Sequence, residues 1–194
     1  MPPRKDTGPS PMNLIEISPP QFDVVLDIAY ARPDNFTGKP VYRRAAAYLH
    51  ADAAERLQEA ILLAASAGLK IKLFDAFRPS EAQWVLWNHT PDPNYISDPR
   101  KGSPHTRGVA VDLTLLDPDG AELAMGTGFD DFSDRAHHGN RDIPADAQRK
   151  RMALLGIMTA AGWDHYAFEW WHYQLFDPGK YPLHDDDVLE EGLM

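Results

Sequence analysis

The sequence predicts a single α+β domain in which helices pack against an antiparallel sheet, with a metal site on that sheet. Residues 109–115 alternate valine and leucine with alanine, aspartate and threonine, the period-two pattern of a strand. Within residues 52–67, Leu57, Ile61 and Ala64 recur at helical spacing. Strands and helices do not alternate regularly, and we expect the strands mainly in the second half. This order favours α+β over a parallel α/β sheet.

The elements of the first half follow from apolar spacing and turn residues. Residues 22–30 mix valine, leucine and isoleucine, compatible with a strand, and the turn-rich loop 32–38 follows. The helix over residues 52–67 meets Gly68, a residue typical of helix ends. Residues 69–74 are short and apolar, which predicts a strand directly after this helix.

The second half continues in the same manner. A proline and a serine open a helix over residues 79–88, and the proline-rich residues 90–102 predict a loop. Residues 144–161 are the longest helix candidate, with Gly162 at its end. Residues 168–176 resemble a strand and are dense in aromatic side chains.

Three segments divide the chain. Residues 1–13 are rich in proline and charge, which predicts a mobile tail. Residues 14–182 form the expected domain, and residues 183–194 form an acidic C-terminal tail that could be loose. A chain of 194 residues is long enough for one domain with a substantial core.

Composition excludes several classes of function. A net charge of −10 leaves no basic face for nucleic acid, and no apolar run approaches the length of a membrane span. The absence of cysteine excludes disulfides, a thiol nucleophile and thiolate metal ligands. We therefore expect a soluble, cytoplasmic protein without nucleic-acid or membrane partners, whose metal ligands would be histidine and carboxylates.

The segment from Ser103 to Leu115 holds a candidate pair of metal ligands. His105 lies between Pro104 and Gly108, in a loop, and Asp112 follows on the predicted strand. A carboxylate in an apolar strand needs compensation for its charge, which a cation would supply. On these two residues alone a loop histidine and a hydrogen-bonded aspartate remain the simpler interpretation.

A second carboxylate and histidine lie far downstream at Glu169 and His172. Two histidines and a carboxylate match the three protein ligands of a hydrolytic zinc, and the glutamate could act as general base. Residues three apart face opposite sides of a regular strand. If both serve one site, the strand must bulge or end between them.

Two other features carry weaker signals. Arg78 could stabilise the negative charge of a tetrahedral intermediate, or it could simply pair with Asp75 or Glu81. The adjacent histidines 137 and 138, close to Asp134, could form a second metal site, but neighbouring side chains diverge too much to chelate one ion easily.

Five segments together resemble a known family, the zinc D-alanyl-D-alanine peptidases that share a fold with the hedgehog amino-terminal domain. Within it the sequence is most similar to the D-alanyl-D-alanine dipeptidases of the vancomycin-resistance type. The segments occur in the family's order and are Y-A-R-P-D-N-F-T-G (30–38), D-A-F-R-P (75–79), S-P-H-T-R-G-V-A-V-D-L-T-L (103–115), M-G-T-G-F-D (125–130) and E-W-W-H-Y (169–173).

This resemblance implies a role for each matching residue. It implies one Zn²⁺ per chain, with the ligands His105, Asp112 and His172. Glu169 would be the catalytic base and Arg78 the arginine that stabilises the transition state. The pocket residues would be Tyr30, Ser103 and Asp130. A carboxylate at Asp130 suits the free ammonium group of a small D,D-dipeptide substrate.

Two other functions stay open from the sequence. One is a zinc D,D-carboxypeptidase or peptidoglycan endopeptidase on the same scaffold, and the other is a non-catalytic zinc-bearing binding module. The departures from the family pattern, at the N-terminus and in residues 90–101, leave the dipeptide preference open. The sequence does not decide the oligomeric state, the metal bound in the cell, or a role in antibiotic resistance against one in cell-wall recycling.

Overall fold

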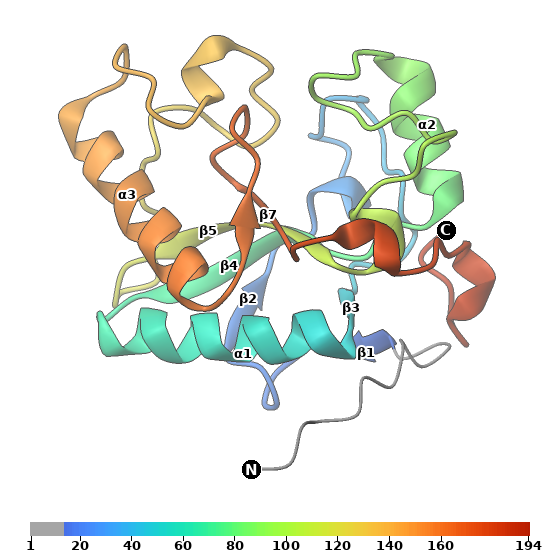
Figure 1. Cartoon of the computed structure of the whole chain (residues 1–194), viewed down its shortest axis with the longest axis horizontal. Coiled ribbons are helices and arrows are strands. Elements are labelled where there is room, and N and C mark those ends of the chain that lie inside the picture. The colour runs from blue at the N-terminus through green and yellow to red at the C-terminus, as the bar shows by residue number, and fades with distance from the viewer. Residues whose placement is uncertain (1–13) are drawn as a thin grey trace.

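A five-stranded sheet forms the centre of the molecule, in the order β2-β4-β5-β7-β6 (Figure 1). The computed structural model describes residues 14–194; the predicted N-terminal tail, residues 1–13, lies outside the described residues. The strands of this sheet are β2 (Val24–Leu26), β4 (Lys70–Asp75), β5 (Ala110–Leu116), β7 (His172–Gln174) and β6 (Asp164–His165). A separate antiparallel pair consists of β1 (Leu14–Glu16) and β3 (Tyr48–His50). The predicted α+β class is confirmed.

Three helices accompany the sheet: α1 (Ala51–Ser66), α2 (Ser80–His89) and α3 (Ala145–Ala160). Each lies within one or two residues of its predicted range. In Figure 1, α1 runs along one side of the sheet, whereas α2 lies on the other side, across a central gap from the upper part of α3. None of the helices within residues 14–194 is both long and apolar enough to cross a membrane.

The sheet is antiparallel except at its β2 edge. The pairs β4–β5, β5–β7 and β7–β6 are antiparallel, whereas β2 pairs with β4 in parallel. Parallel neighbours need a crossover connection, and here α1 lies in the chain between the two strands. The expected concentration of strands in the second half is wrong, because β1 to β4 all precede residue 76. Strands of three residues are too short for a period-two pattern to reveal them.

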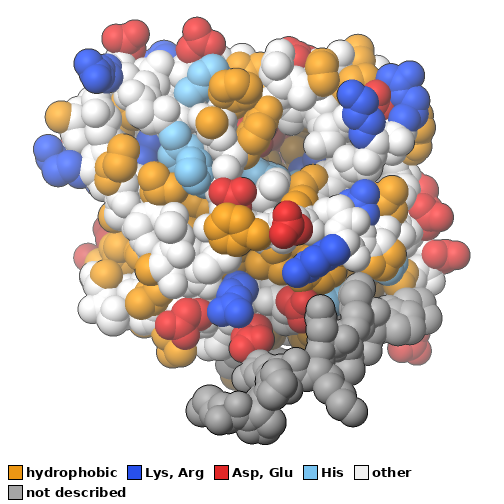
Figure 2. Space-filling model, in the orientation of Figure 1, with side chains coloured by type: hydrophobic (Ala, Val, Ile, Leu, Met, Phe, Trp, Pro, Cys, Tyr) orange, Lys and Arg blue, Asp and Glu red, His pale blue; other side chains and the backbone are white. Residues whose placement is uncertain are grey.

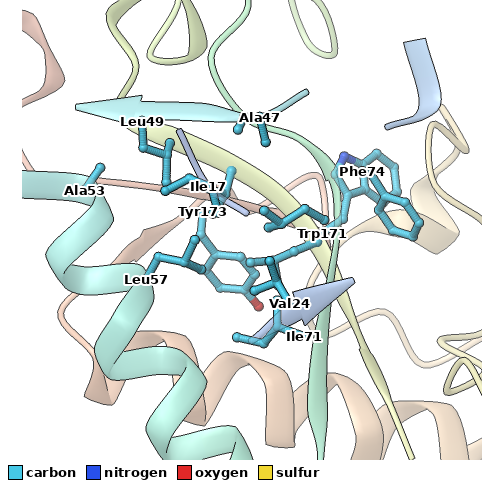
Figure 3. Close-up of a cluster of buried hydrophobic side chains, with 14 of the residues drawn as sticks. Ile17, Val24, Ala47, Leu49, Ala53, Leu57, Ile71, Phe74, Trp171 and Tyr173 are labelled. Carbon is cyan, nitrogen blue, oxygen red and sulfur yellow. The ribbon is translucent and has the colours of Figure 1, made fainter. Parts of the chain in front are cut away.

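The main core lies between the sheet and the helices α1 and α3. Leu57 from α1 meets the sheet residues Val24, Ile71 and Tyr173, all of them buried (Figure 3). Strand β5 is buried on both faces along its whole length. Val111, Leu113 and Leu115 join this core, and the residues that alternate with them, including Asp112, therefore face a second enclosed space on the opposite side of the sheet.

The acidic residues 183–194 pack against the domain and are not loose. The side chain of Leu193 is fully buried, and its carbonyl oxygen accepts a hydrogen bond from the backbone N–H of Arg43. Asp186 accepts hydrogen bonds from the backbone N–H groups of Leu193 and Met194. A local composition of acids and glycine gave no indication of these distant contacts.

Candidate metal centre and active-site cavity

The sheet register brings Asp112 and His172 together. Asp112 on β5 pairs directly with His172, the first residue of β7, and side chains opposite each other on neighbouring strands lie on the same face. His172 Nδ1 lies 3.1 Å from Asp112 Oδ1. The strand predicted over residues 168–176 begins only at His172, so Glu169 lies before β7 and not on it. This meets the condition under which two residues three apart can serve one site.

His105 reaches the same point from a 3₁₀ turn, His105–Arg107. Its Nε2 atom lies 3.3 Å from Asp112 Oδ2 and 3.2 Å from His172 Nδ1. Gly108 ends this turn with φ +67°, and a Cβ there would lie 2.6 Å from a Leu14 side-chain carbon and 3.2 Å from the backbone nitrogen of His50. Only glycine allows the chain to turn this tightly into β5.

The three side chains have the donor set of a zinc site. One potential ligand atom from each of His105, Asp112 and His172 lies within 4.8 Å of the others, and all three residues are buried. The Nδ1 atom of His105 donates to the carbonyl oxygen of Ala76 at 2.7 Å, which leaves the lone pair on Nε2 directed at the site. Two imidazole nitrogens and one carboxylate are ligands that Zn²⁺ accepts, with a position left for water.

The charge of Asp112 suits a cation. Burial by itself would raise the pKa of this carboxyl group, but His105 and His172, through charge and hydrogen bonds, outweigh burial and hold the pKa far below its usual value. The carboxylate is therefore ionised at any physiological pH.

Arg78 lies beside this centre in a buried polar network. Its Nε donates to Asp75 Oδ2 at 2.8 Å and its Nη1 to Gln83 Oε1 at 3.1 Å, while Nη2 lies 3.4 Å from Asp112 Oδ2. The alternative interpretation from the sequence, an ion pair with Asp75, is thus also present. Because the guanidinium group still lines the cavity described below, the ion pair positions it and does not remove it from the site.

Glu169 is a buried carboxylate next to the three candidate ligands. Its Oε2 atom lies 3.9 Å from His172 Nδ1. Burial, followed by the negative charges of Asp112 and Asp130, raises the pKa of Glu169 well above its usual value. A carboxylate with a raised pKa is a stronger base than an exposed one.

A cavity of about 260 Å³ connects all of these groups. The eight residues to which the family resemblance gives a role all line it; they are Tyr30, Arg78, Ser103, His105, Asp112, Asp130, Glu169 and His172. The face shown in Figure 2 is hollowed near its middle, and acidic and basic side chains are interspersed over it.

One end of the cavity carries the carboxylate of Asp130. Tyr30 donates its hydroxyl hydrogen to Asp130 Oδ2 at 3.1 Å, and its ring lies beneath the guanidinium group of Arg78. Burial, and after it the charge of Asp112, raises the pKa of Asp130 well above its usual value. The hydroxyl oxygen of Ser103 accepts a hydrogen bond from the backbone N–H of His105, so Ser103 supports the histidine turn as well as lining the cavity.

The adjacent histidines 137 and 138 do not form a second centre. His137 Nε2 lies 3.5 Å from the Tyr95 hydroxyl and 3.8 Å from Asp134, whereas the ring of His138 packs against His165. Among residues 14–194, His105, Asp112 and His172 make up the only cluster of three or more potential metal ligands.

Sequence reasoning named Asp75 as a possible partner of Arg78 but missed other residues that hold the site residues in place. Gln83 also binds Arg78, and Gln174 contacts His172. The loop before Ser103 contributes residues 93–97 to the cavity wall. The hydroxyl group of Tyr166 donates a hydrogen bond to the carbonyl oxygen of Asn94 in this loop, at 2.9 Å. Gln174 had a detectable signal, because it stands two residues after His172 on a predicted strand and so faces the same side.

The loop that carries Asp130 depends on Arg151 of α3. The buried guanidinium group donates to the carbonyl oxygens of Met125, Arg135 and His137, at both ends of this loop. Arg151→Met should lower the free energy of unfolding by about 2–4 kcal/mol. Loss of the donor to the buried carbonyl oxygen of Met125 costs ~1–3 kcal/mol, and the two partly buried hydrogen bonds to Arg135 and His137 add a smaller amount. Denaturant unfolding measures this loss. Arg149→Met, on the exposed face of the same helix, should change it by less than about 0.5 kcal/mol.

Comparisons with known sequences show which family the chain resembles. A sequence model of the family described as D-ala-D-ala dipeptidase matches residues 11–190. A D-alanyl-D-alanine dipeptidase of Escherichia coli K12 is 44% identical over 161 residues, which cover 83% of this chain and 83% of that protein. Proteins of the same name from Enterococcus faecalis V583 and Enterococcus faecium are 36% and 37% identical, and each match covers 78% of this chain and 85% of the relative.

Proposed function

The chain belongs to the D-Ala-D-Ala dipeptidase family of metallopeptidases, and on this premise we propose that it hydrolyses D-alanyl-D-alanine to two molecules of D-alanine. The proposed cofactor is one Zn²⁺, held by His105, Asp112 and His172. One observation carries the proposal: this donor set shares a single small cavity with a buried glutamate, a buried arginine and a separate carboxylate.

Each catalytic role follows from chemistry and position. Zinc, when bound, would polarise the scissile carbonyl and make water more acidic. Glu169 accepts a proton from the attacking water and transfers it to the leaving amine. Arg78 donates hydrogen bonds to the oxygen on which negative charge develops. The buried, fixed positions of both side chains mean that little reorganisation is needed during the reaction.

Substrate length is set by Asp130 in this proposal. A dipeptide carries its free ammonium group on the residue whose carbonyl is attacked, and Asp130 offers a partly buried carboxylate to pair with it. A blocked or longer peptide has no cation at that position and would leave the charge of the carboxylate uncompensated. The same pairing would overcome the raised pKa of Asp130, because a nearby cation favours the ionised form.

The direct test combines metal analysis with an assay of released D-alanine. We expect one zinc per chain, hydrolysis of D-Ala-D-Ala that a chelator removes and added zinc restores, and little hydrolysis of N-acetyl-D-Ala-D-Ala. Faster cleavage of the blocked peptide than of the free dipeptide would favour a carboxypeptidase or endopeptidase. Full zinc occupancy without hydrolysis of any D,D-peptide would refute the catalytic proposal.

Asp130→Asn tests ammonium recognition separately. Asparagine keeps the shape and the acceptor oxygen but loses the charge, so KM for D-Ala-D-Ala should rise roughly 10- to 100-fold, since a hydrogen bond to a charged group is worth ~1.5–3 kcal/mol. Steady-state kinetics measures this change. Asp131→Asn, at the neighbouring residue outside the cavity lining, is the matched control and should leave KM unchanged. An unaltered KM in Asp130→Asn would place the ammonium group elsewhere.

A further inference from the structure

Gln174 lies beside the candidate ligand His172 because of strand geometry. On β7, His172 and Gln174 share the face towards the cavity, and Tyr173 between them points into the core (Figure 3). The His172 Nε2 atom lies 3.1 Å from Gln174 Oε1, while Nδ1 lies 3.1 Å from Asp112 Oδ1. Both ring nitrogens therefore have a polar neighbour: Asp112 among the candidate ligands, and Gln174 further along the strand.

The nitrogen that faces the other ligands decides which tautomer a metal requires. Nδ1 faces both Asp112 and His105, so it must offer its lone pair to a cation, and a neutral ring then carries its hydrogen on Nε2. An amide oxygen at Nε2 accepts that hydrogen. If the Gln174 amide turned its NH₂ group towards the ring, it would favour hydrogen on Nδ1, where His172 would donate to Asp112 and could not bind a metal.

The two candidate histidine ligands differ in the group that fixes their tautomer. His105 donates from Nδ1 to the backbone carbonyl of Ala76, an acceptor that no substitution removes. For His172 the corresponding acceptor is the side chain of Gln174, which a substitution can remove. The partners behind metal-binding histidines fix the ring orientation and raise ligand basicity.

We propose that Gln174 is a positioning residue that holds His172 in the tautomer with hydrogen on Nε2 and so presents Nδ1 to the metal. The inference rests on the proposed zinc site but not on the identity of the peptide that is cleaved. Gln174 would thus affect the affinity of the site for zinc, a quantity that is measured without substrate.

Two substitutions separate positioning from simple packing. Gln174→Leu removes the acceptor, and the zinc dissociation constant should rise about 10- to 100-fold, the usual effect of losing such a partner. Gln174→Glu keeps an acceptor at the same place and should bind zinc at least as tightly as the wild type. Gln21→Leu, at an exposed glutamine outside the cavity lining, should have no effect.

The measurements are zinc affinity by competition with a chromogenic chelator, and ¹H–¹⁵N NMR of histidine side chains in the zinc-loaded protein. We expect a slowly exchanging His172 Nε2–H in the wild type and in Gln174→Glu, and a rapidly exchanging one in Gln174→Leu. Wild-type affinity in folded Gln174→Leu would overturn the proposal, and so would equally weak binding by both variants. A wild-type chain that binds no zinc would overturn the metal site itself, whereas failure to cleave D-Ala-D-Ala would leave these affinities as a valid test of Gln174.

Discussion

Glu169→Gln should lower kcat for D-Ala-D-Ala by about 10²- to 10⁴-fold, the usual contribution of general base catalysis, while zinc remains bound. Glutamine has nearly the same shape as glutamate and keeps an acceptor oxygen, but it cannot take a proton from water. The glutamate is not one of the three clustered ligands, so the metal content should not change. Steady-state kinetics and metal analysis on the same sample test both statements.

The raised pKa of Glu169 adds a second readout for this substitution. Burial comes first among the causes, so ionising Glu169 in the metal-free protein costs stability. Because the folded-state pKa lies above the unfolded one, the folded protein binds more protons, and stability falls as the pH rises above the ordinary carboxyl range. Metal-free Glu169→Gln should therefore unfold at a higher temperature than the wild type at pH 7, and this difference should vanish at acidic pH.

A matched control is Glu55→Gln on the exposed side of α1, which should alter neither activity nor stability appreciably. Retention of full activity in zinc-loaded Glu169→Gln would mean that another group is the base. Loss of both zinc and activity would instead show that Glu169 helps to bind the metal.

The longer elements of the fold were predictable because their patterns are long enough to repeat. The helices over residues 51–66 and 145–160 span several turns, and β5 has seven residues with clear alternation. On β5 the polar positions were also informative, since Asp112 faces the site and not solvent. Strands such as β3 and β6 depend on pairing with distant segments, which local spacing does not contain.

The candidate site likewise has residues that the sequence predicts and residues that it does not. The clustered residues His105, Asp112 and His172 belong to motifs that the sequence displays, and the fold brings them together. Asp75 and Ser103, which help to hold the site, also belong to these motifs, but other supporting residues lie outside them. Gln83 is an example: one end of its amide accepts from Arg78 and the other donates to the carbonyl oxygen of Ser97, a link that exists only after folding.

Arg78→Lys should lower kcat by roughly 10²- to 10³-fold with a smaller change in KM, because the proposed hydrogen bond to the oxyanion forms only in the transition state. Lysine keeps the positive charge between Asp75 and Asp112, so gross destabilisation by two uncompensated buried carboxylates is avoided. It has no planar fork, however, and cannot contact Asp75 and Gln83 at once with a donor left towards the cavity.

Arg78→Ala separates the contribution of the positive charge from that of the guanidinium fork geometry. It removes the charge as well as the fork, so it should lose activity and also lower the free energy of unfolding by about 3–5 kcal/mol, the usual result of breaking a buried ion pair. Arg100→Lys makes the same arginine-to-lysine exchange outside the site, at a surface residue that pairs with Asp98. As the control it should retain full kcat. If Arg78→Lys kept the wild-type kcat, charge would suffice and the fork geometry would have no catalytic role. If Arg78→Lys matched Arg78→Ala in stability, the network with Asp75 would depend on hydrogen-bond geometry more than on charge.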